Sequence, residues 1–167
     1  MTAANVLTLL RLAAVPLFTY LFFLEGLNPG WIALVFVLTG VTDVLDGRLA
    51  RARNEVTRFG TLADPLADKL MMLVAVFALT ARGSVPRWVA VLLAAKELVQ
   101  IVGAGFFLVS KSKVTPANSA GKLATVLLYI GITGVIMGVS GMLYVLILGV
   151  GVSLIAGLGY LLQALEK

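Results

Sequence analysis

This 167-residue chain contains no cysteine and no histidine. It can therefore form no disulfide, and it offers no thiolate nucleophile, no imidazole base and no histidine ligand for zinc. Charged residues are also scarce, at 13% of the chain, and only eight residues are acidic. Carboxylate oxygens are the metal ligands that remain, and they suit hard cations such as Mg²⁺ or Mn²⁺.

Apolar residues are abundant instead: 60% of the chain is hydrophobic and the mean hydropathy is +1.06. Apolar stretches of about 20 residues recur, which is the length of a helix that spans a bilayer. We expect an all-α, polytopic membrane protein of six transmembrane helices, forming one domain over residues 1–167. The first segment contains Arg11 and no small-residue cleavage site, so we expect a retained helix. The expected spans are 5–24, 31–53, 61–81, 88–109, 119–138 and 141–165.

The basic residues predict an orientation for these spans. With the N-terminus in the cytoplasm, eight lysines and arginines lie at cytoplasmic connections or the C-terminus, and two lie on the other side. This asymmetry follows the positive-inside rule. The cytoplasmic set is Arg48, Arg51, Arg53, Arg58, Lys111, Lys113, Lys122 and Lys167, and the opposite set is Arg82 and Arg87.

All four aspartates of the chain, Asp43, Asp46, Asp64 and Asp68, fall in one short window. Residues three or four apart share a helix face, so each pair forms part of one stripe. Carboxylates inside a bilayer are costly and indicate a functional site. Four converging carboxylates repel one another, so cations must lie between them. We therefore predict a divalent-metal site that holds a phosphorylated substrate near the cytoplasmic membrane surface.

Small residues and one arginine accompany the aspartates. Gly47, Ala50 and Gly60 have little side-chain bulk, which lets a large ligand lie against the backbone. Arg51 can donate a fork of hydrogen bonds to a phosphate. Two carboxylate-bound metal ions can stabilise both the attacking and the leaving oxygen of a displacement. The window therefore indicates a pyrophosphate site.

The pattern Asp-x-x-Asp-Gly-x-x-Ala-Arg-x8-Gly-x-x-x-Asp-x-x-x-Asp resembles the signature of the CDP-alcohol phosphatidyltransferases. An N-terminal Asn-x-x-Thr-x-x-Arg pattern (Asn5, Thr8, Arg11) extends the resemblance over most of the chain. All eight signature positions are filled, by Asp43, Asp46, Gly47, Ala50, Arg51, Gly60, Asp64 and Asp68.

The resemblance implies a reaction and a role for each signature residue. An alcohol hydroxyl would attack the β-phosphate of a CDP-linked lipid, and CMP would leave. Asp43, Asp46, Asp64 and Asp68 would ligate two divalent ions, Mg²⁺ or Mn²⁺, and Asp68 would also be the general base. The resemblance also implies a homodimer. The residues implied to contact the CDP moiety are Asn5, Thr8, Asp46, Gly47, Ala50, Arg51 and Gly60.

Within that family, residues 5–11 and 57–69 are similar to bacterial phosphatidylglycerophosphate synthases. These enzymes transfer a phosphatidyl group from CDP-diacylglycerol to glycerol 3-phosphate. This acceptor is a dianion, for which Arg11, Lys96 and Lys122 are the candidate cationic partners. Two departures, Lys96 in place of an arginine and the absence of a second lysine after Lys122, leave open a cardiolipin synthase that uses phosphatidylglycerol.

Two other classes remain as alternatives: a small cation or proton transporter, and a non-catalytic membrane scaffold. The expected partners of the enzyme are CDP-diacylglycerol, glycerol 3-phosphate and the bilayer, with no nucleic acid. We expect a multi-pass protein of the cell membrane whose active site faces the cytoplasm. Small-residue pairs (Gly134 with Gly138, Gly149 with Ser153, Ser153 with Gly157) predict close helix packing, either within one chain or in a dimer.

Overall fold

The structure is a computed structural model that describes the backbone of residues 3–52, 58–109 and 119–165, and the side chains of residues 10–42, 69–100 and 119–159. Over these ranges the fold is entirely helical. The bounds of every helix lie within three residues of those expected from the sequence. The helices are α1 (Ala3–Phe23), α2 (Pro29–Ala52), α3 (Arg58–Ala81), α4 (Arg87–Val109), α5 (Ser119–Ile136) and α6 (Met142–Leu165).

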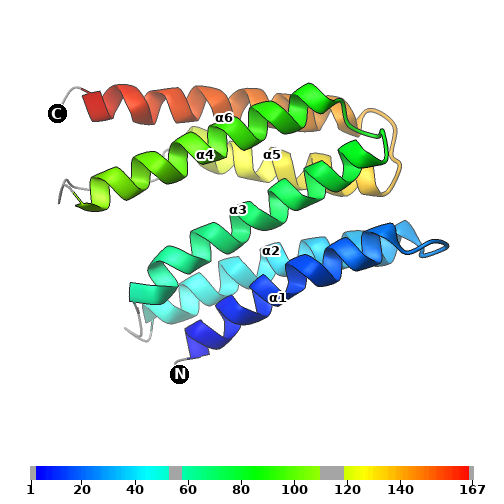
Figure 1. Cartoon of the computed structure of the whole chain (residues 1–167), viewed down its shortest axis with the longest axis horizontal. Helices are drawn as coiled ribbons and strands as arrows, with labels where there is room; N and C mark the ends of the chain where they lie inside the picture. Colours follow the sequence, from blue (N-terminus) through cyan, green and yellow to red (C-terminus); the bar gives the residue numbers. More distant parts are fainter. Residues whose placement is uncertain (1–2, 53–57, 110–118, 166–167) are drawn as a thin grey trace.

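The six helices run up and down in one bundle (Figure 1). Helices α1, α2 and α3 pack against one another, and α4, α5 and α6 lie alongside them, with α3 contacting both α4 and α5. The connections after α1, α3 and α5 lie together at one end. At the opposite end, the start of α1, the end of α2 and the start of α3 lie close together (Figure 1). This arrangement has the alternating order that successive membrane spans require.

Two helix ends show how local sequence sets these boundaries. Asn28 precedes α2 and its Oδ1 accepts a hydrogen bond of 2.7 Å from the Gly30 amide. Pro29 then occupies the first helical position, where a missing N–H costs little. At the end of α5, Gly138 has φ +70°, and the amide of Val139 donates to the carbonyl of Gly134 over 2.9 Å. Glycine adopts this left-handed conformation without strain, so Gly138 terminates the helix.

Aromatic side chains join the two halves of the bundle. Phe18 of α1 lies 5.8 Å from Phe22 and 5.9 Å from Phe36 of α2, measured between ring centroids. Phe36 lies 5.0 Å from Tyr129 of α5. The three phenylalanines are almost completely buried. Each such ring pair adds about 0.5–1.5 kcal/mol beyond the burial of its apolar area.

The outer surface of the bundle is also apolar. Tyr20, Trp31, Tyr144 and Ile155 are each more than 60% exposed, and they come from four different places along the chain. Apolar surface of this extent is unusual on a soluble monomer and suits contact with lipid. Within the parts of the chain whose side chains are described, two helices are long and apolar enough to cross a bilayer, Ser119–Ile136 and Met142–Gly159. The structure confirms six helices over the described residues, and two of them qualify as membrane spans, so six transmembrane spans stay a prediction.

Glycines bring α5 and α6 into close contact. A Cβ atom added to Gly131 would lie 2.6 Å from the Leu146 backbone, and one added to Gly149 would lie 3.0 Å from the Leu128 amide nitrogen. These glycines therefore serve packing within one chain. Gly134 likewise faces Met142 of α6. Gly138 lies beyond α5 and ends it, so the expected packing role of the Gly134–Gly138 pair holds for Gly134 alone.

Candidate active site

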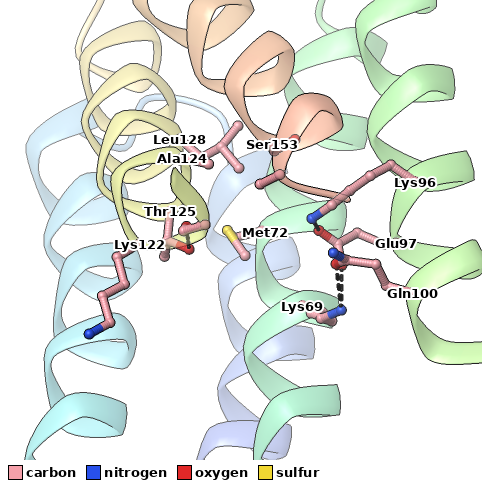
Figure 2. Close-up of a pocket in the computed structure, with 12 residues that line it drawn as sticks. Lys69, Met72, Lys96, Glu97, Gln100, Lys122, Ala124, Thr125, Leu128 and Ser153 are labelled. Atoms are coloured by element: carbon pink, nitrogen blue, oxygen red, sulfur yellow. Dashed lines mark hydrogen bonds and ion pairs between the residues drawn. The ribbon is translucent and has the colours of Figure 1, made fainter. Parts of the chain in front are cut away.

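A cavity of about 240 Å³ lies between α3, α4, α5 and α6. Apolar side chains such as Met72 and Leu128 form part of its wall, and seven polar side chains complete it (Figure 2). Drug-sized ligands usually occupy pockets of about 300–1,000 Å³, so this cavity suits a smaller polar molecule. The polar residues are Lys69, Lys96, Glu97, Gln100, Lys122, Thr125 and Ser153.

Glu97 joins two lysines on one side of this cavity. Its Oε2 lies 2.8 Å from Nζ of Lys69, and its Oε1 lies 2.6 Å from Nζ of Lys96. Lys69 also donates a hydrogen bond of 3.1 Å to Oε1 of Gln100. Figure 2 shows these four side chains turned toward one another, from α3 on one side and α4 on the other. The result is a bridged cationic group that spans two helices.

Burial makes this pairing necessary. Glu97 is only 2% exposed, and the side chains of Lys69 and Lys96 are 23% and 12% exposed. An isolated carboxylate in such surroundings is strongly unfavourable, whereas a carboxylate that is ion-paired with two ammonium groups is compensated. Two lysines against one glutamate leave this group positively charged. It is therefore suited to an anionic ligand.

The three expected acceptor-binding residues do not lie together. Lys96 is part of the bridged group, whereas Lys122 lines the cavity from α5 with its ammonium group turned away from the other lysines (Figure 2). Arg11 lies on α1 and is 4% exposed. Arg11 does not line this cavity. Of the three, Lys96 alone belongs to the bridged group, and the acceptor-binding roles stay predictions.

The helices that carry the signature come together at one end of the bundle. The C-terminal half of α2 contains Asp43, Asp46, Gly47, Ala50 and Arg51, and the first half of α3 contains Gly60, Asp64 and Asp68. Asn5 and Thr8 belong to the start of α1. The backbones of α1, α2 and α3 meet at this end (Figure 1).

The side chains of all these signature residues lie outside the part of the chain for which side chains are described. Their metal, base and CDP-binding roles stay predictions. The donor set itself fits a divalent cation, because two pairs of carboxylates at helical spacing occupy two helices that pack together at the same end. Among the described residues, no group of three or more potential metal ligands occurs.

Sequence reasoning missed two residues of the bridged group, Lys69 and Gln100. A signal was available, because Lys69 directly follows Asp68 and the two Cα atoms are therefore about 3.8 Å apart. The contact with α4 depends on how the helices pack, which residue spacing along α3 does not reveal.

Comparison with known proteins gives a consistent result. A family model described as CDP-alcohol phosphatidyltransferase matches residues 1–156. A cardiolipin synthase (CMP-forming) of Streptomyces coelicolor is 39% identical over 75% of this chain and 60% of its own length. A probable phosphatidylglycerophosphate synthase of Mycobacterium tuberculosis is 34% identical over 98% of this chain and 81% of its own length. A CDP-diacylglycerol–glycerol-3-phosphate 3-phosphatidyltransferase of Rickettsia typhi is 34% identical over 87% of this chain and 83% of its own length.

Proposed function

The chain belongs to the CDP-alcohol phosphatidyltransferase family, and we propose that it transfers a phosphatidyl group from CDP-diacylglycerol to glycerol 3-phosphate. The products would be CMP and phosphatidylglycerophosphate. Family membership makes the protein a transferase of phospholipid biosynthesis, which argues against the transporter and the scaffold. The observation that supports the choice of acceptor is the cationic cavity lined by Lys69, the residue that follows Asp68 on α3.

The cavity adjoins the expected reacting centre through α3. Lys69 directly follows Asp68 on α3, so the helix that carries the expected base also contributes a cation to the cavity. We assign Asp68 as the general base that takes the proton of the acceptor hydroxyl. The bridged lysines would hold the phosphate of the same acceptor, so that one molecule of glycerol 3-phosphate spans the two groups. Holding both parts of the acceptor in place lowers the entropy cost of the attack.

The CDP moiety would lie along the ends of α1, α2 and α3. Asp43, Asp46, Asp64 and Asp68 would hold two divalent ions, Mg²⁺ or Mn²⁺. When bound, such ions supply Lewis-acid stabilisation of phosphoryl charge. The residues that would border the nucleotide are Asn5, Thr8, Asp46, Gly47, Ala50, Arg51 and Gly60. The meeting of these three helices at one end supports this assignment.

Phosphatidylglycerol is the second candidate acceptor. It is favoured by the 39% identity to a relative named cardiolipin synthase, which acts with release of CMP according to its name. The small cavity volume and the two bridged lysines fit a free phosphate monoester better, because a monoester carries more negative charge than a phosphodiester. Glycerol 3-phosphate is therefore the primary assignment.

We also propose that all six helices cross the cell membrane, as one domain, with the active site toward the cytoplasm. Exposed apolar side chains on the described parts of the bundle support the membrane location. The alternating helix order brings the expected cytoplasmic ends to one side (Figure 1). A homodimer is part of this proposal.

The decisive experiment is CMP release from CDP-diacylglycerol by the purified protein with Mg²⁺ or Mn²⁺, testing each acceptor separately. The proposal predicts release that depends on glycerol 3-phosphate, with phosphatidylglycerophosphate as the lipid product. Chelation of the metal should stop release, and either ion should restore it. Release with phosphatidylglycerol alone would establish the second candidate. No release with any acceptor from folded protein would refute the proposal.

A further inference from the structure

Glu97 presents a problem for any site that binds an anion. A carboxylate that lines such a cavity repels the ligand, and burying it is costly unless it is compensated. Glu97 is nevertheless 2% exposed and lines the cavity. Its two oxygens contact two different ammonium groups, at 2.8 Å for Lys69 and 2.6 Å for Lys96. Both oxygens are thus directed at cations, and the lysines screen the carboxylate from the cavity.

The hydrogen bonds of the bridged group leave donors for a ligand. Each lysine ammonium has three N–H donors. Lys69 directs one at Glu97 in their ion pair and donates one to Gln100, and Lys96 donates one to Glu97. Within the described part of the chain, these contacts leave one N–H of Lys69 and two of Lys96. A phosphate group has enough oxygens to accept all three.

The carboxylate also determines where these donors lie. Both ammonium groups are within 3 Å of the same carboxylate, although one comes from α3 and the other from α4. Two cations beside one carboxylate repel each other, and the negative charge between them offsets this repulsion. Lysine side chains are flexible, so without the carboxylate the two ammonium groups would separate. The arrangement is therefore a phosphate site whose geometry depends on an acidic residue.

We propose that Glu97 is a positioning residue for the acceptor: it holds Lys69 and Lys96 together so that both donate to the acceptor's phosphate group. This inference rests on the proposed function. Glu97 itself does not touch the acceptor, and its effect passes through the two lysines. The competing explanation is a purely structural ion pair that ties α3 to α4.

The test is the steady-state kinetics of Glu97→Gln, measured by CMP release with glycerol 3-phosphate and CDP-diacylglycerol varied in turn. We expect the KM for glycerol 3-phosphate to rise about tenfold, which corresponds to about 1.4 kcal/mol of binding free energy. The KM for CDP-diacylglycerol should change less than twofold, and kcat less than threefold. Glu25→Gln is the matched control, because Glu25 is an exposed glutamate in the turn between α1 and α2. Its kinetics should equal those of the unaltered protein.

A second set of variants separates positioning from structure. In protein that already carries Lys69→Met and Lys96→Met, Glu97 would be an uncompensated anion beside the acceptor. Adding Glu97→Gln to that protein should then lower the KM for glycerol 3-phosphate, which reverses the sign of its effect. If the ion pairs of Glu97 only link α3 to α4, no such reversal is expected. If Glu97→Gln fails to fold, Glu97→Asp replaces it, and we expect a rise of about threefold because the shorter side chain cannot reach both lysines.

The outcomes distinguish a failure of the proposed function from a failure of the role assigned to Glu97. If the unaltered protein shows no release dependent on glycerol 3-phosphate, the proposed function fails, and this inference fails with it. If that activity is present but the KM for glycerol 3-phosphate is unchanged in Glu97→Gln, only the role of Glu97 is refuted. A parallel rise in both KM values, or a lower melting temperature with normal kinetics, would establish the structural tie instead.

Discussion

The ammonium group of Lys69 and the carboxylate of Glu97 form an ion pair of 2.8 Å between α3 and α4. Lys69 is the neighbour of Asp68, the residue to which the signature assigns the proton transfer. This pair therefore connects a helix that carries part of the signature with α4, which carries no signature residue and lines the same cavity.

The two lysines that line the cavity from α3 and α5 should differ in their effect on acceptor binding. Lys69→Met removes one ammonium group of the bridged group. We therefore expect the KM for glycerol 3-phosphate to rise about tenfold, which corresponds to about 1.4 kcal/mol of binding free energy. Lys122→Met removes an ammonium group that is turned away from the other lysines. In this variant the KM for glycerol 3-phosphate should rise less than threefold. Initial rates of CMP release at varied glycerol 3-phosphate would measure both. Equal effects would mean that Lys122 turns inward when the acceptor binds.

The aspartates of α2 and α3 should separate metal binding from proton transfer. Asp68→Asn keeps the size of the side chain but removes the base, so CMP release should fall about 10²–10⁴-fold, the usual contribution of a general base. Binding of CDP-diacylglycerol should remain close to normal. Asp43→Asn should in addition weaken Mn²⁺ binding, which titration calorimetry of the purified protein would measure. Near-normal turnover of Asp68→Asn would refute the assignment of the base.

The contact between α5 and α6 should be sensitive to a single methyl group. Gly131→Ala places a Cβ atom 2.6 Å from the backbone of Leu146, which cannot move without displacing α6. We expect a loss of about 1–3 kcal/mol, as for other overpacked sites. Gly151→Ala on α6 is the control, because no atom lies within 4 Å of its added Cβ. Thermal denaturation in detergent should show a lower melting temperature for the first variant and not for the second.

Arg82 should stabilise the end of α1 at the opposite side of the bundle. Its Nη2 donates a hydrogen bond to the carbonyl of Phe22, and its guanidinium carbon lies 4.4 Å from the centroid of the Phe22 ring. We expect Arg82→Ala to cost about 1 kcal/mol, the sum of an exposed cation–π contact and a charged hydrogen bond that is partly replaced by water. Arg87→Ala serves as the control for loss of a nearby exposed arginine. CMP release should be unaffected in both, since neither arginine lines the cavity.

The helices were predictable because their boundaries depend on short segments of sequence. Apolar runs set their lengths, and residues such as Asn28, Pro29 and Gly138 determine where they begin and end. The transferase family was predictable for a similar reason. Eight residues at fixed spacing over two neighbouring helices form a pattern that a chain rarely contains by chance.

The cavity was predictable only in part. Lys96 and Glu97 are neighbours in the sequence, and the structure shows an ion pair of 2.6 Å between them. Arg11, Lys96 and Lys122 were grouped by charge and expected side of the membrane. Neither the charge of a residue nor its side of the membrane fixes the distance between helices. The structure places Lys96 and Lys122 at one cavity, with their ammonium groups apart, and Arg11 elsewhere.

The sequence by itself determined the helices, the family and the residues able to hold metal ions, because periodicity and spacing act within about 25 residues of chain. Only the tertiary structure decided that Lys69 meets Glu97 and that Gly131 and Gly149 serve packing within the chain. Those contacts depend on which helices pack together and on the rotation of each about its axis. These are set by the fit of all the side chains at once, and no local pattern encodes them.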